Sequence, residues 1–400
     1  MTYDLLDGVR VIEASMYAFA PSSAAVLADW GADVIKVVPP DLADPMKGTP
    51  IAGLPDKDVG VAFMWEIMNR GKRCVGLDVS TDDGHAILLD LVRDADVFIT
   101  NLLPGARQRF HLDTDDLFAV NAGLIYGRAS GHGDRGPERE AGGFDHTDFW
   151  ARTGIGHAAS MVAGEFVPQA GPALGDLSSG AFLAGGIAAA LFRRERTGRG
   201  AVVDVSLLSS GMWAFAPGVV ASQLYGVETI PRLRHSDLPN PLVAGYVTRD
   251  GRIIYFAGVQ TERHFENFCE IIGRPDLPRD ERFATASARA ANAADCIKVL
   301  DEIFATRDLA EWTEVLRGLS TPWTVVQTAA EAAVDPQVRA NAYVVDTGAS
   351  PVVASPAQFD EVPPTLGPAP DHGEHTEEVL LALGRDWDEI LRLKESRVVN

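Results

Sequence analysis

The chain has 400 residues, 46% hydrophobic and 23% charged, which is typical of a globular protein with a sizeable core. Its formal net charge of −21 argues against nucleic acid and anionic membrane surfaces as partners. The three cysteines, Cys74, Cys269 and Cys296, have neither metal-ligand spacing nor the pattern of a disulfide framework, so we expect a reducing environment and no metal site.

Strand and helix patterns alternate through the first half of the chain. The expected strands are 9–15, 33–38, 96–100 and 123–128, with helices between them. A helix over 179–195, another strand and another helix follow. This alternation predicts an α/β fold with a parallel sheet covered on both faces. No G-x-G-x-x-G follows the first strand, so the dinucleotide-binding fingerprint is missing.

A different texture begins near residue 228. The stretch "GYVTRDGRIIYFAG" predicts a hairpin that turns at Asp250 and Gly251, and several short helices follow to about residue 319. We therefore expect a first domain over 1–227 and a small α+β domain over 228–321. The remaining segment, 322–400, contains a proline-rich stretch and ends in an amphipathic helix over 374–393.

One acidic residue, Asp176, stands in the small-residue run "ALGDLSSG" before the expected helix over 179–195. It could belong to the cap of that helix, with Ser178 or Ser179. It could instead be a nucleophile, because an attacking carboxylate must be ionised and the positive end of a helix dipole would keep it so. The flanking Gly175 and Gly180 would then leave room for a bulky substrate. The residues alone leave both interpretations open.

Several segments resemble the class III CoA-transferases, the family of formyl-CoA transferase, carnitine CoA-transferase and α-methylacyl-CoA racemase. They include "GVRVIEAS", "NRGKRCVGLDV", "NLLPGARQRF", "GDLSSG", "NPLVAGYVTRDGRIIYF" and "LGPAPDHGEHTEEVLLALG", and they follow one another over nearly the whole chain. The resemblance implies a Rossmann-like large domain that both termini build, with 322–400 completing it, and a smaller α+β domain. It also implies that two chains interlock as a homodimer.

The resemblance gives Asp176 the place of a catalytic aspartate. It implies an acyl-CoA:carboxylate CoA-transferase in which Asp176 forms first an acyl anhydride and then a CoA thioester. Coenzyme A, its acyl thioesters and a free carboxylic acid would be substrates, with no tightly bound cofactor. Lys72, Arg73 and Arg109 match segments that the family places around the CoA nucleotide. Asn101 follows the expected strand 96–100, at the carboxyl edge of the sheet where ligands bind, so we expect it to contact CoA as well. Each of the four could alternatively be an ordinary surface or loop residue.

The sequence also departs from the family pattern. Ala18 falls where formyl transferases carry an active-site glutamine, so the acyl group cannot be carried over from those enzymes. The segment "GGFDHTDFW" leaves open a racemase in which His146 and Asp176 form an acid–base pair, although Phe144 holds the place of the racemase histidine. His146 could also be a plain loop or core histidine. In the same segment, Phe149 and Trp150 hint at an apolar acyl chain.

A third interpretation is a non-catalytic acidic binding protein, which the presence of Asp176 disfavours. The N-terminus has no basic region leading into an apolar run, and no apolar stretch reaches the roughly 20 residues of a membrane span. We therefore expect a cytoplasmic enzyme with neither membrane nor nucleic-acid partners.

Overall fold

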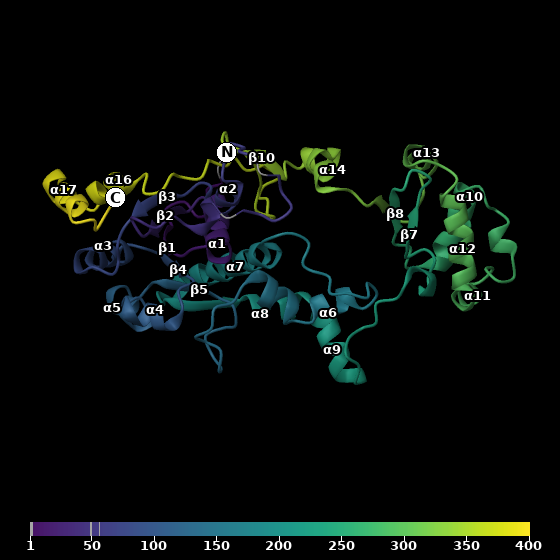
Figure 1. The fold of residues 1–400 in the computed structure, drawn as a ribbon, viewed down its shortest axis with the longest axis horizontal. Coiled ribbons are helices and arrows are strands. Elements are labelled where there is room, and N and C mark those ends of the chain that lie inside the picture. The colour runs from purple at the N-terminus through teal and green to yellow at the C-terminus, as the bar shows by residue number, and fades with distance from the viewer. Residues whose placement is uncertain (1–2, 49, 56) are drawn as a thin grey trace. The chain divides into compact units, whose positions relative to one another are not determined.

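The structure, a computed structural model, describes residues 3–48, 50–55 and 57–400 (Figure 1). The chain forms two compact units: a large unit of Met1–Ser160, Glu165–Ile230 and Pro336–Asn400, and a small unit of Met161–Gly164 and Pro231–Asp335. Both ends of the chain therefore belong to the large unit. The small unit ends at Asp335 and not at the expected 321, because β9 (Trp323–Val325) pairs with β8 (Ile253–Phe256) in the small unit's sheet.

A six-stranded parallel sheet forms the centre of the large unit, in the order β3-β2-β1-β4-β5-β6. Its strands are β1 (Arg10–Ala14), β2 (Asp33–Val38), β3 (Arg73–Gly76), β4 (Val97–Thr100), β5 (Ile125–Ser130) and β6 (Ala201–Ser206). This order is that of the Rossmann fold, and the direction of winding reverses between β1 and β4. The expected Rossmann-like α/β fold is confirmed, and ligands in such sheets bind where the direction reverses, at the carboxyl ends of the strands.

Helices cover both faces of this sheet. One face packs against α1 (Phe19–Asp29) and α7 (Leu174–Thr197), and the other against α3 (Asp82–Arg93), α5 (Thr114–Val120), α16 (Thr376–Ala382) and α17 (Trp387–Glu395). Successive strand residues point to opposite faces, so Val11 joins the α1 and α7 layer while Ile12 joins the other. In Figure 1 the C-terminal helices, in yellow, lie at the β3 end of the sheet.

The central helix α7 begins earlier than the sequence predicts, at Leu174 and not at 179. Its length and its hydropathy of 1.4 would allow it to cross a membrane. Leu183, Ile187 and Leu191 are nevertheless buried in the core cluster that contains the sheet residues, as in the core helix of a globular unit. Asp176 consequently lies inside the first turn of α7 and not ahead of it.

Connecting elements complete the large unit. They are η1 (Pro45–Lys47), α2 (Phe63–Asn69), α4 (Pro104–Arg109), η2 (Asp145–Ala151), α6 (Ile155–Ser160), α8 (Leu207–Ala214), α9 (Ala216–Tyr225), α15 (Pro336–Ala340), β10 (Val344–Asp346) and β11 (Pro351–Val353). The single C-terminal helix that the sequence predicts over 374–393 is two helices, α16 and α17, because Gly384 adopts a φ of +83° between them.

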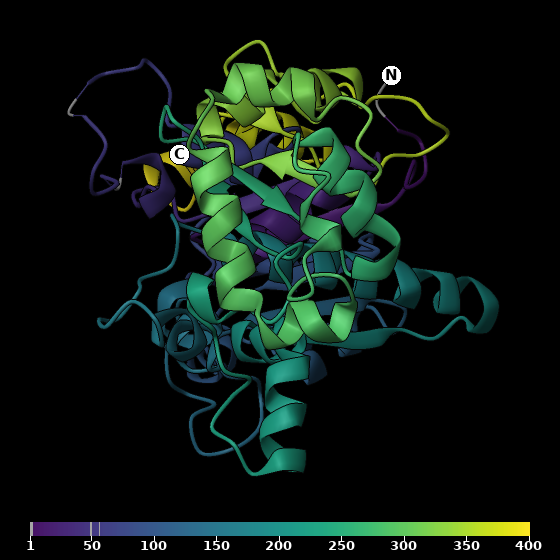
Figure 2. The same ribbon diagram turned by 90° about the vertical axis from the view of Figure 1, so that its right-hand side faces the viewer.

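The small unit, green in Figure 2, combines an antiparallel sheet with helices. Its elements are η3 (His235–Asp237), β7 (Gly245–Val247), β8, α10 (Thr261–Ile271), η4 (Leu277–Arg279), α11 (Ala286–Ala291), α12 (Ala293–Phe304), α13 (Leu309–Val315), β9 and α14 (Ala329–Val334). The predicted hairpin is present, and Gly251 takes the positive φ of +76° that its turn requires. The expected α+β character of this unit is confirmed.

Candidate active site

A cavity of about 370 Å³ lies in the large unit and includes residues that follow β1 and β4. Its lining comes from the loop after β1 (Met16, Tyr17), the segment after β4 (Asn101, Leu102, Leu103), the end of β5, the stretch before η2 (Gly142, Gly143, Phe144) and Asp176. The cavity therefore occupies the place where a doubly wound sheet binds its ligand. Among the described residues that line it, Asp176 has the sole carboxylate.

Two glycines bring α7 close to its neighbours. A Cβ on Gly175 would lie 2.3 Å from Asp145 Oδ1 and 2.3 Å from Phe149 Cγ, and a Cβ on Gly180 would lie 2.0 Å from Ser22 Oγ. The expectation that these glycines leave room for substrate is therefore wrong: both spaces are filled by the protein itself. Their small size lets α7 dock against η2 and α1, and this docking sets the position of Asp176.

Asp145 caps the start of α7. Its Oδ1 accepts a hydrogen bond from the Gly175 amide at 2.9 Å, and its Oδ2 accepts one from Gln169 Nε2 at 2.6 Å. Ser178, by contrast, lies within the helix and donates to the Leu174 carbonyl at 2.8 Å. The capping role considered for Asp176 and its serines thus belongs to Asp145, which the sequence analysis missed because Asp145 lies some 30 residues away in the chain.

The surroundings of Asp176 favour its protonated form. Burial, and to a smaller extent the nearby carboxylate of Asp145, together raise the pKa of Asp176 to about 7. The expectation that the helix N-terminus holds this group ionised is therefore wrong, because burial and the Asp145 charge both raise the pKa of Asp176. A weakly solvated carboxylate with a raised pKa is a stronger nucleophile once it has lost its proton.

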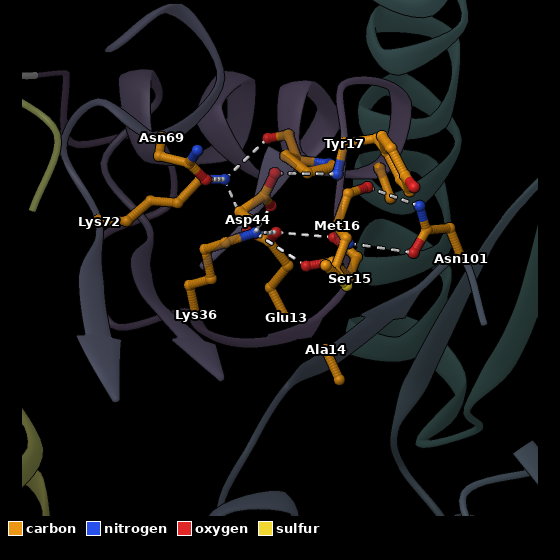
Figure 3. A network of polar contacts seen from close by, with 12 residues as sticks. Glu13, Ala14, Ser15, Met16, Tyr17, Lys36, Asp44, Asn69, Lys72 and Asn101 are labelled. Atoms are coloured by element: carbon orange, nitrogen blue, oxygen red, sulfur yellow. Dashed lines mark hydrogen bonds and ion pairs between the residues drawn. The ribbon is translucent and has the colours of Figure 1, made fainter. Parts of the chain in front are cut away.

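Asn101 joins the segment after β4 to the loop after β1, where the sheet reverses its winding. Its Nδ2 donates to the Met16 carbonyl at 2.7 Å, and its Oδ1 accepts from the Met16 amide at 3.2 Å (Figure 3). Asn101 also lines the cavity, as its place after β4 predicts. In this structure its amide group fixes the loop after β1 beside the cavity.

A buried ion network lies beneath that loop (Figure 3). Glu13 on β1 accepts from Lys36 Nζ at 2.8 Å and from Lys72 Nζ at 2.6 Å, and all three side chains are fully buried. Burial alone would raise the pKa of Glu13, but the two lysines outweigh it and lower the pKa to about 2. Burial lowers the pKa of Lys72 to about 8, against the attraction of Glu13.

The geometry corrects the CoA role expected for Lys72. Its ammonium donates to Glu13, to the Pro21 carbonyl at 2.8 Å and to Asn69 Oδ1 at 3.0 Å, so its three N–H groups are all engaged. The network continues to Asp44, whose Oδ2 lies 3.6 Å from Lys36 Nζ. Lys72 is therefore a buried structural cation that a phosphate cannot reach.

Tyr17 is held at the cavity by the same network. Asp44 Oδ1 accepts from the Tyr17 amide at 3.4 Å, and Tyr17 adopts a φ of +67°, which is uncommon for a bulky residue. The Tyr17 ring meets Phe144 edge to face, with ring centroids 5.6 Å apart. Ala18, next in the chain, is buried against Met68 and Ala173, so Tyr17 takes the place at the cavity that the sequence analysis considered for residue 18.

The other predicted site residues lie outside the cavity lining. Arg73 on β3 pairs with Asp33 at 2.7 Å and with Glu378 at 3.1 Å, so its guanidinium is already bound by carboxylates. Arg109 ends α4 as an exposed side chain stacked on the Phe110 ring at 4.6 Å. Within residues 3–48, 50–55 and 57–400, no acidic side chain lies within ion-pair distance of Arg109.

His146 lies on η2, is exposed, and is not among the described residues that line the cavity with Asp176. Phe149 packs inward against Gly175, and Trp150 donates from its Nε1 to the Val167 carbonyl at 2.9 Å. These two aromatic residues support η2, and Phe144 supplies the aromatic surface at the cavity. In the described part of the chain, no group of three or more His, Cys, Asp or Glu side chains could hold a metal ion.

Residues 6–376 match the family described as CoA-transferase family III. The chain is 33% identical over 404 residues to (R)-2-hydroxy-4-methylpentanoate CoA-transferase of Clostridioides difficile, covering 99% of each chain. It is 29% identical over 403 residues to cinnamoyl-CoA:phenyllactate CoA-transferase of Clostridium sporogenes, covering 98% of this chain and 97% of that one.

Solved structures agree with these relatives. A CaiB/BaiF family protein from Brucella suis superposes with a TM-score of 0.81 at 28% identity, over 96% of this chain and all of that one. A Mycobacterium tuberculosis protein in an orthorhombic crystal form gives 0.80 at 27% identity, over 94% and 99%. From the near-complete family match and the shared fold, the chain belongs to CoA-transferase family III and is a CoA-transferase that acts on CoA thioesters.

Proposed function

We propose that the protein transfers coenzyme A from an acyl-CoA to a free carboxylic acid and that Asp176 is its nucleophile. The observation that carries this proposal is the position of the Asp176 carboxylate, in an apolar cavity at the carboxyl edge of the sheet. The raised pKa of Asp176 supports it, because perturbed carboxyl groups in clefts are characteristic of catalytic sites.

The reaction proceeds through covalent intermediates on Asp176. Its carboxylate attacks the thioester carbonyl and expels the CoA thiolate, which leaves an acyl-aspartyl anhydride. The thiolate then attacks the Asp176 carbonyl, releasing the donor acid and forming an aspartyl-CoA thioester. The acceptor carboxylate displaces CoA from this thioester to give a second anhydride. The thiolate finally attacks the acceptor's acyl carbon, which yields the new acyl-CoA and frees Asp176.

Exclusion of water protects these intermediates. The energy of the thioester is kept only if water does not hydrolyse the anhydride or the aspartyl-CoA thioester. The apolar side chains of Met16, Leu102 and Leu207 around Asp176 leave little to hold a water molecule beside it. Asn101 acts here by fixing the loop after β1. Arg109 is the member of the predicted CoA-binding set whose guanidinium has no acidic partner among the described residues and could therefore bind a phosphate.

The racemase alternative requires a second base facing Asp176 across the substrate. His146 is exposed and outside the described cavity lining, which favours the transferase. The two CoA-transferases from Clostridioides difficile and Clostridium sporogenes indicate which acceptor acids to test, because each name contains a 2-hydroxy acid with an apolar side chain. We include such acids among the acceptors to test. A cytoplasmic location and an interlocked homodimer remain part of the proposal.

Trapping the intermediate tests the nucleophile. The protein is incubated with an acyl-CoA, treated with hydroxylamine and digested, and we expect mass spectrometry to find the modification on Asp176. Asp176→Asn keeps the shape of the side chain but removes its nucleophilicity, so transfer of labelled CoA to a free acid should fall by at least about a thousandfold.

His146→Ala is the matched variant and should keep most of the transfer activity. Exchange of the α-proton with deuterated water in the absence of any acid would support the racemase instead. An Asp176→Asn protein with unchanged transfer, or a label on a different residue, would remove Asp176 from the mechanism.

A further inference from the structure

The lining of the Asp176 cavity is apolar except at a few positions. Met16, Phe19, Leu102 and Leu207 contribute carbon surface, and in the described part of the chain no lysine, arginine or histidine lines the cavity. Apart from Asp176, the described lining side chains with hydrogen-bonding groups are Tyr17, Asn101 and Ser130, and of these Asn101 and Ser130 already have partners. Asn101 bonds the Met16 backbone, and Ser130 Oγ accepts from the Gly133 amide at 3.0 Å.

Two aromatic rings form one wall of the cavity. Tyr17 and Phe144 belong to different loops, meet edge to face at 5.6 Å and remain 42% and 57% exposed. Rings of this size that remain open to solvent in a ligand cavity offer contact area with little conformational entropy to lose. The pair is therefore available to a ligand.

Buried carboxylates fix the backbone of both aromatic residues. Asp44 holds the Tyr17 amide, and Asp148 Oδ2 accepts from the Phe144 amide at 2.9 Å. Behind Phe144, a Cβ on Gly143 would lie 2.3 Å from Asp148 Oδ2, so this loop approaches η2 as closely as a glycine allows. The aromatic wall is thus anchored at each end by a buried carboxylate.

A second negative charge on the acyl group would find no cation among the described residues that line this cavity. A carboxylate packed against this apolar lining would lose part of its hydration, meet no cation among the described lining residues and lie near Asp176. An apolar branch or ring would instead cover Tyr17, Phe144 and the aliphatic lining, and so gain from the removal of carbon surface from water. The electrostatic and the hydrophobic arguments favour the same kind of substrate.

We propose that the cavity selects acyl groups with an uncharged, apolar side chain, branched aliphatic or aromatic, and that Tyr17 and Phe144 determine this selectivity. This proposal deepens the function proposed above and rests on it for the identity of the site. It commits to monocarboxylic acyl groups and excludes those with a second carboxylate, such as succinyl or oxalyl.

A panel of thioesters tests the selectivity. Isovaleryl-CoA, 3-phenylpropanoyl-CoA and succinyl-CoA are compared as donors to one common acid, and their binding to the Asp176→Asn protein is measured by calorimetry. We expect kcat/KM for the two apolar donors to exceed that for succinyl-CoA by at least about a hundredfold. Equal or better use of succinyl-CoA would overturn the proposal.

Variants of the aromatic wall separate a role in specificity from a role in folding. Phe144→Ala should lower kcat/KM for 3-phenylpropanoyl-CoA by about ten- to a hundredfold and change the succinyl-CoA value much less. Phe144→Arg supplies the missing cation and should raise the use of succinyl-CoA. Tyr17→Phe keeps the ring and should keep the selectivity. Phe192→Ala removes an equally exposed ring outside the described cavity lining and should alter neither donor.

The two proposals can fail separately. If no thioester labels Asp176 while the Asp176→Asn protein still binds the apolar thioesters preferentially, the nucleophile is wrong and the selectivity stands. If all donors label Asp176 equally and Phe144→Ala lowers kcat/KM for all of them by the same factor, the nucleophile stands and the proposed selectivity is wrong.

Discussion

Asp176 shows how a single side chain takes its chemistry from its neighbours. Near neutral pH it lies close to the midpoint of its titration, because burial raises its pKa to about 7 and Asp145 opposes its ionisation. If Asp176 is the nucleophile, as proposed above, it must react as the carboxylate, so the fraction of active enzyme should grow as pH rises through this value. Under that proposal, the protonation of Asp176 would set the pH range of the first step.

The pH dependence of kcat/KM for an acyl-CoA follows from this. Below pH 7 we expect kcat/KM to rise by about tenfold per pH unit and to level off above, with one inflection near the Asp176 pKa. The measurement is a series of initial rates between pH 5 and 9. Asp145→Asn keeps a group that can accept from the Gly175 amide but removes the charge, so its inflection should move to lower pH. A flat profile across this range would mean that another group limits the reaction.

At the residue scale, the sequence predicts part of this site. Asp176 is identified through its motif, and Asn101 through its place after a strand. Asp145, Tyr17 and the buried partners of Lys72 could not be predicted, because each acts through residues far away in the chain. An exposed phosphate-binding lysine and a fully buried one can occupy the same short motif, and only the packing of β1 against β2 and β2 against β3 distinguishes them.

At the scale of elements, the contact between α1 and α7 depends on one glycine. A Cβ on Gly180 would lie 2.0 Å from Ser22 Oγ and 3.0 Å from the Ser23 amide, so Gly180→Ala would force α1 and α7 apart. We expect Gly180→Ala to lower the free energy of unfolding by about 1–3 kcal/mol and to reduce transfer activity, because α7 carries Asp176.

Gly185→Ala is the matched control in the same helix. A Cβ there meets nothing within 4 Å, and alanine is the better helix former, so this variant should be as stable as the wild type or more so. Chemical denaturation of both variants measures the difference. Equal stability of the two would show that α1 and α7 tolerate a larger separation.

The Glu13 network joins three neighbouring strands. Glu13 on β1 pairs with Lys36 on β2 and with Lys72 just before β3, so Glu13→Gln would leave two buried ammonium groups without their shared counterion. We expect the free energy of unfolding to fall by about 3–5 kcal/mol, since removing one partner of a buried ion pair leaves a charge that is buried and uncompensated. Glu314→Gln breaks the exposed pair with Arg317 and should leave the melting temperature nearly unchanged. A Glu13→Gln protein as stable as the wild type would show that water enters the network.

Most of the elements are predictable from periodicity, and the failures have local causes. The predicted strand over 33–38 coincides with β2, while β3 is too short and too mixed in sequence to stand out. The sequence predicts the start of α7 at 179 and not at Leu174, because glycine and serine in "ALGDLSSG" are poor helix formers that the contacts with η2 and α1 override. The small unit extends past 321 because strand pairing, which the sequence alone does not reveal, decides where β9 belongs.

For the whole molecule, the net charge of −21 repels an anionic substrate at a distance. Binding of CoA then needs a local cation, and Arg109 is exposed and unpaired by any acidic side chain of the described residues. We expect Arg109→Ala to weaken CoA binding about ten- to a hundredfold, since a charge-assisted hydrogen bond to phosphate contributes about 1.5–3 kcal/mol.

Arg73→Ala is the comparison variant, because Asp33 and Glu378 already hold that guanidinium. Its CoA affinity should match the wild type, and calorimetric titration with CoA at two salt concentrations measures both. The loss for Arg109→Ala should shrink at high salt as screening weakens the wild-type contact. Unchanged affinity after Arg109→Ala would place the nucleotide elsewhere.

The expected homodimer makes a separate prediction. Trp213 on α8 and Leu224 and Tyr225 on α9 are 71%, 75% and 78% exposed, which is unusual for large apolar side chains that lie so close in the chain. If this surface is covered by a second chain, light scattering should give a dimer even at nanomolar concentration. Tyr225→Glu should weaken the assembly, whereas Tyr255→Glu on the exposed face of β8 should not. A wild-type monomer at micromolar concentration would contradict the prediction.

The large unit cannot finish folding until the small unit has been synthesised, because its last segment, Pro336–Asn400, follows the small unit in the chain. The core against one face of the sheet includes Val379 of α16, Ile390 of α17 and Val399, which forms an isolated bridge with Leu77. While the small unit is being synthesised, that face of the nascent sheet is covered by α3 and α5 only and lacks the contacts of α16 and α17. A partly folded sheet with exposed apolar residues is prone to aggregation, so we expect a chaperone to bind it until α16 and α17 are made. Removal of the segment from Ile390 to Val399 would therefore destabilise the folding large unit, although neither residue lines the Asp176 cavity.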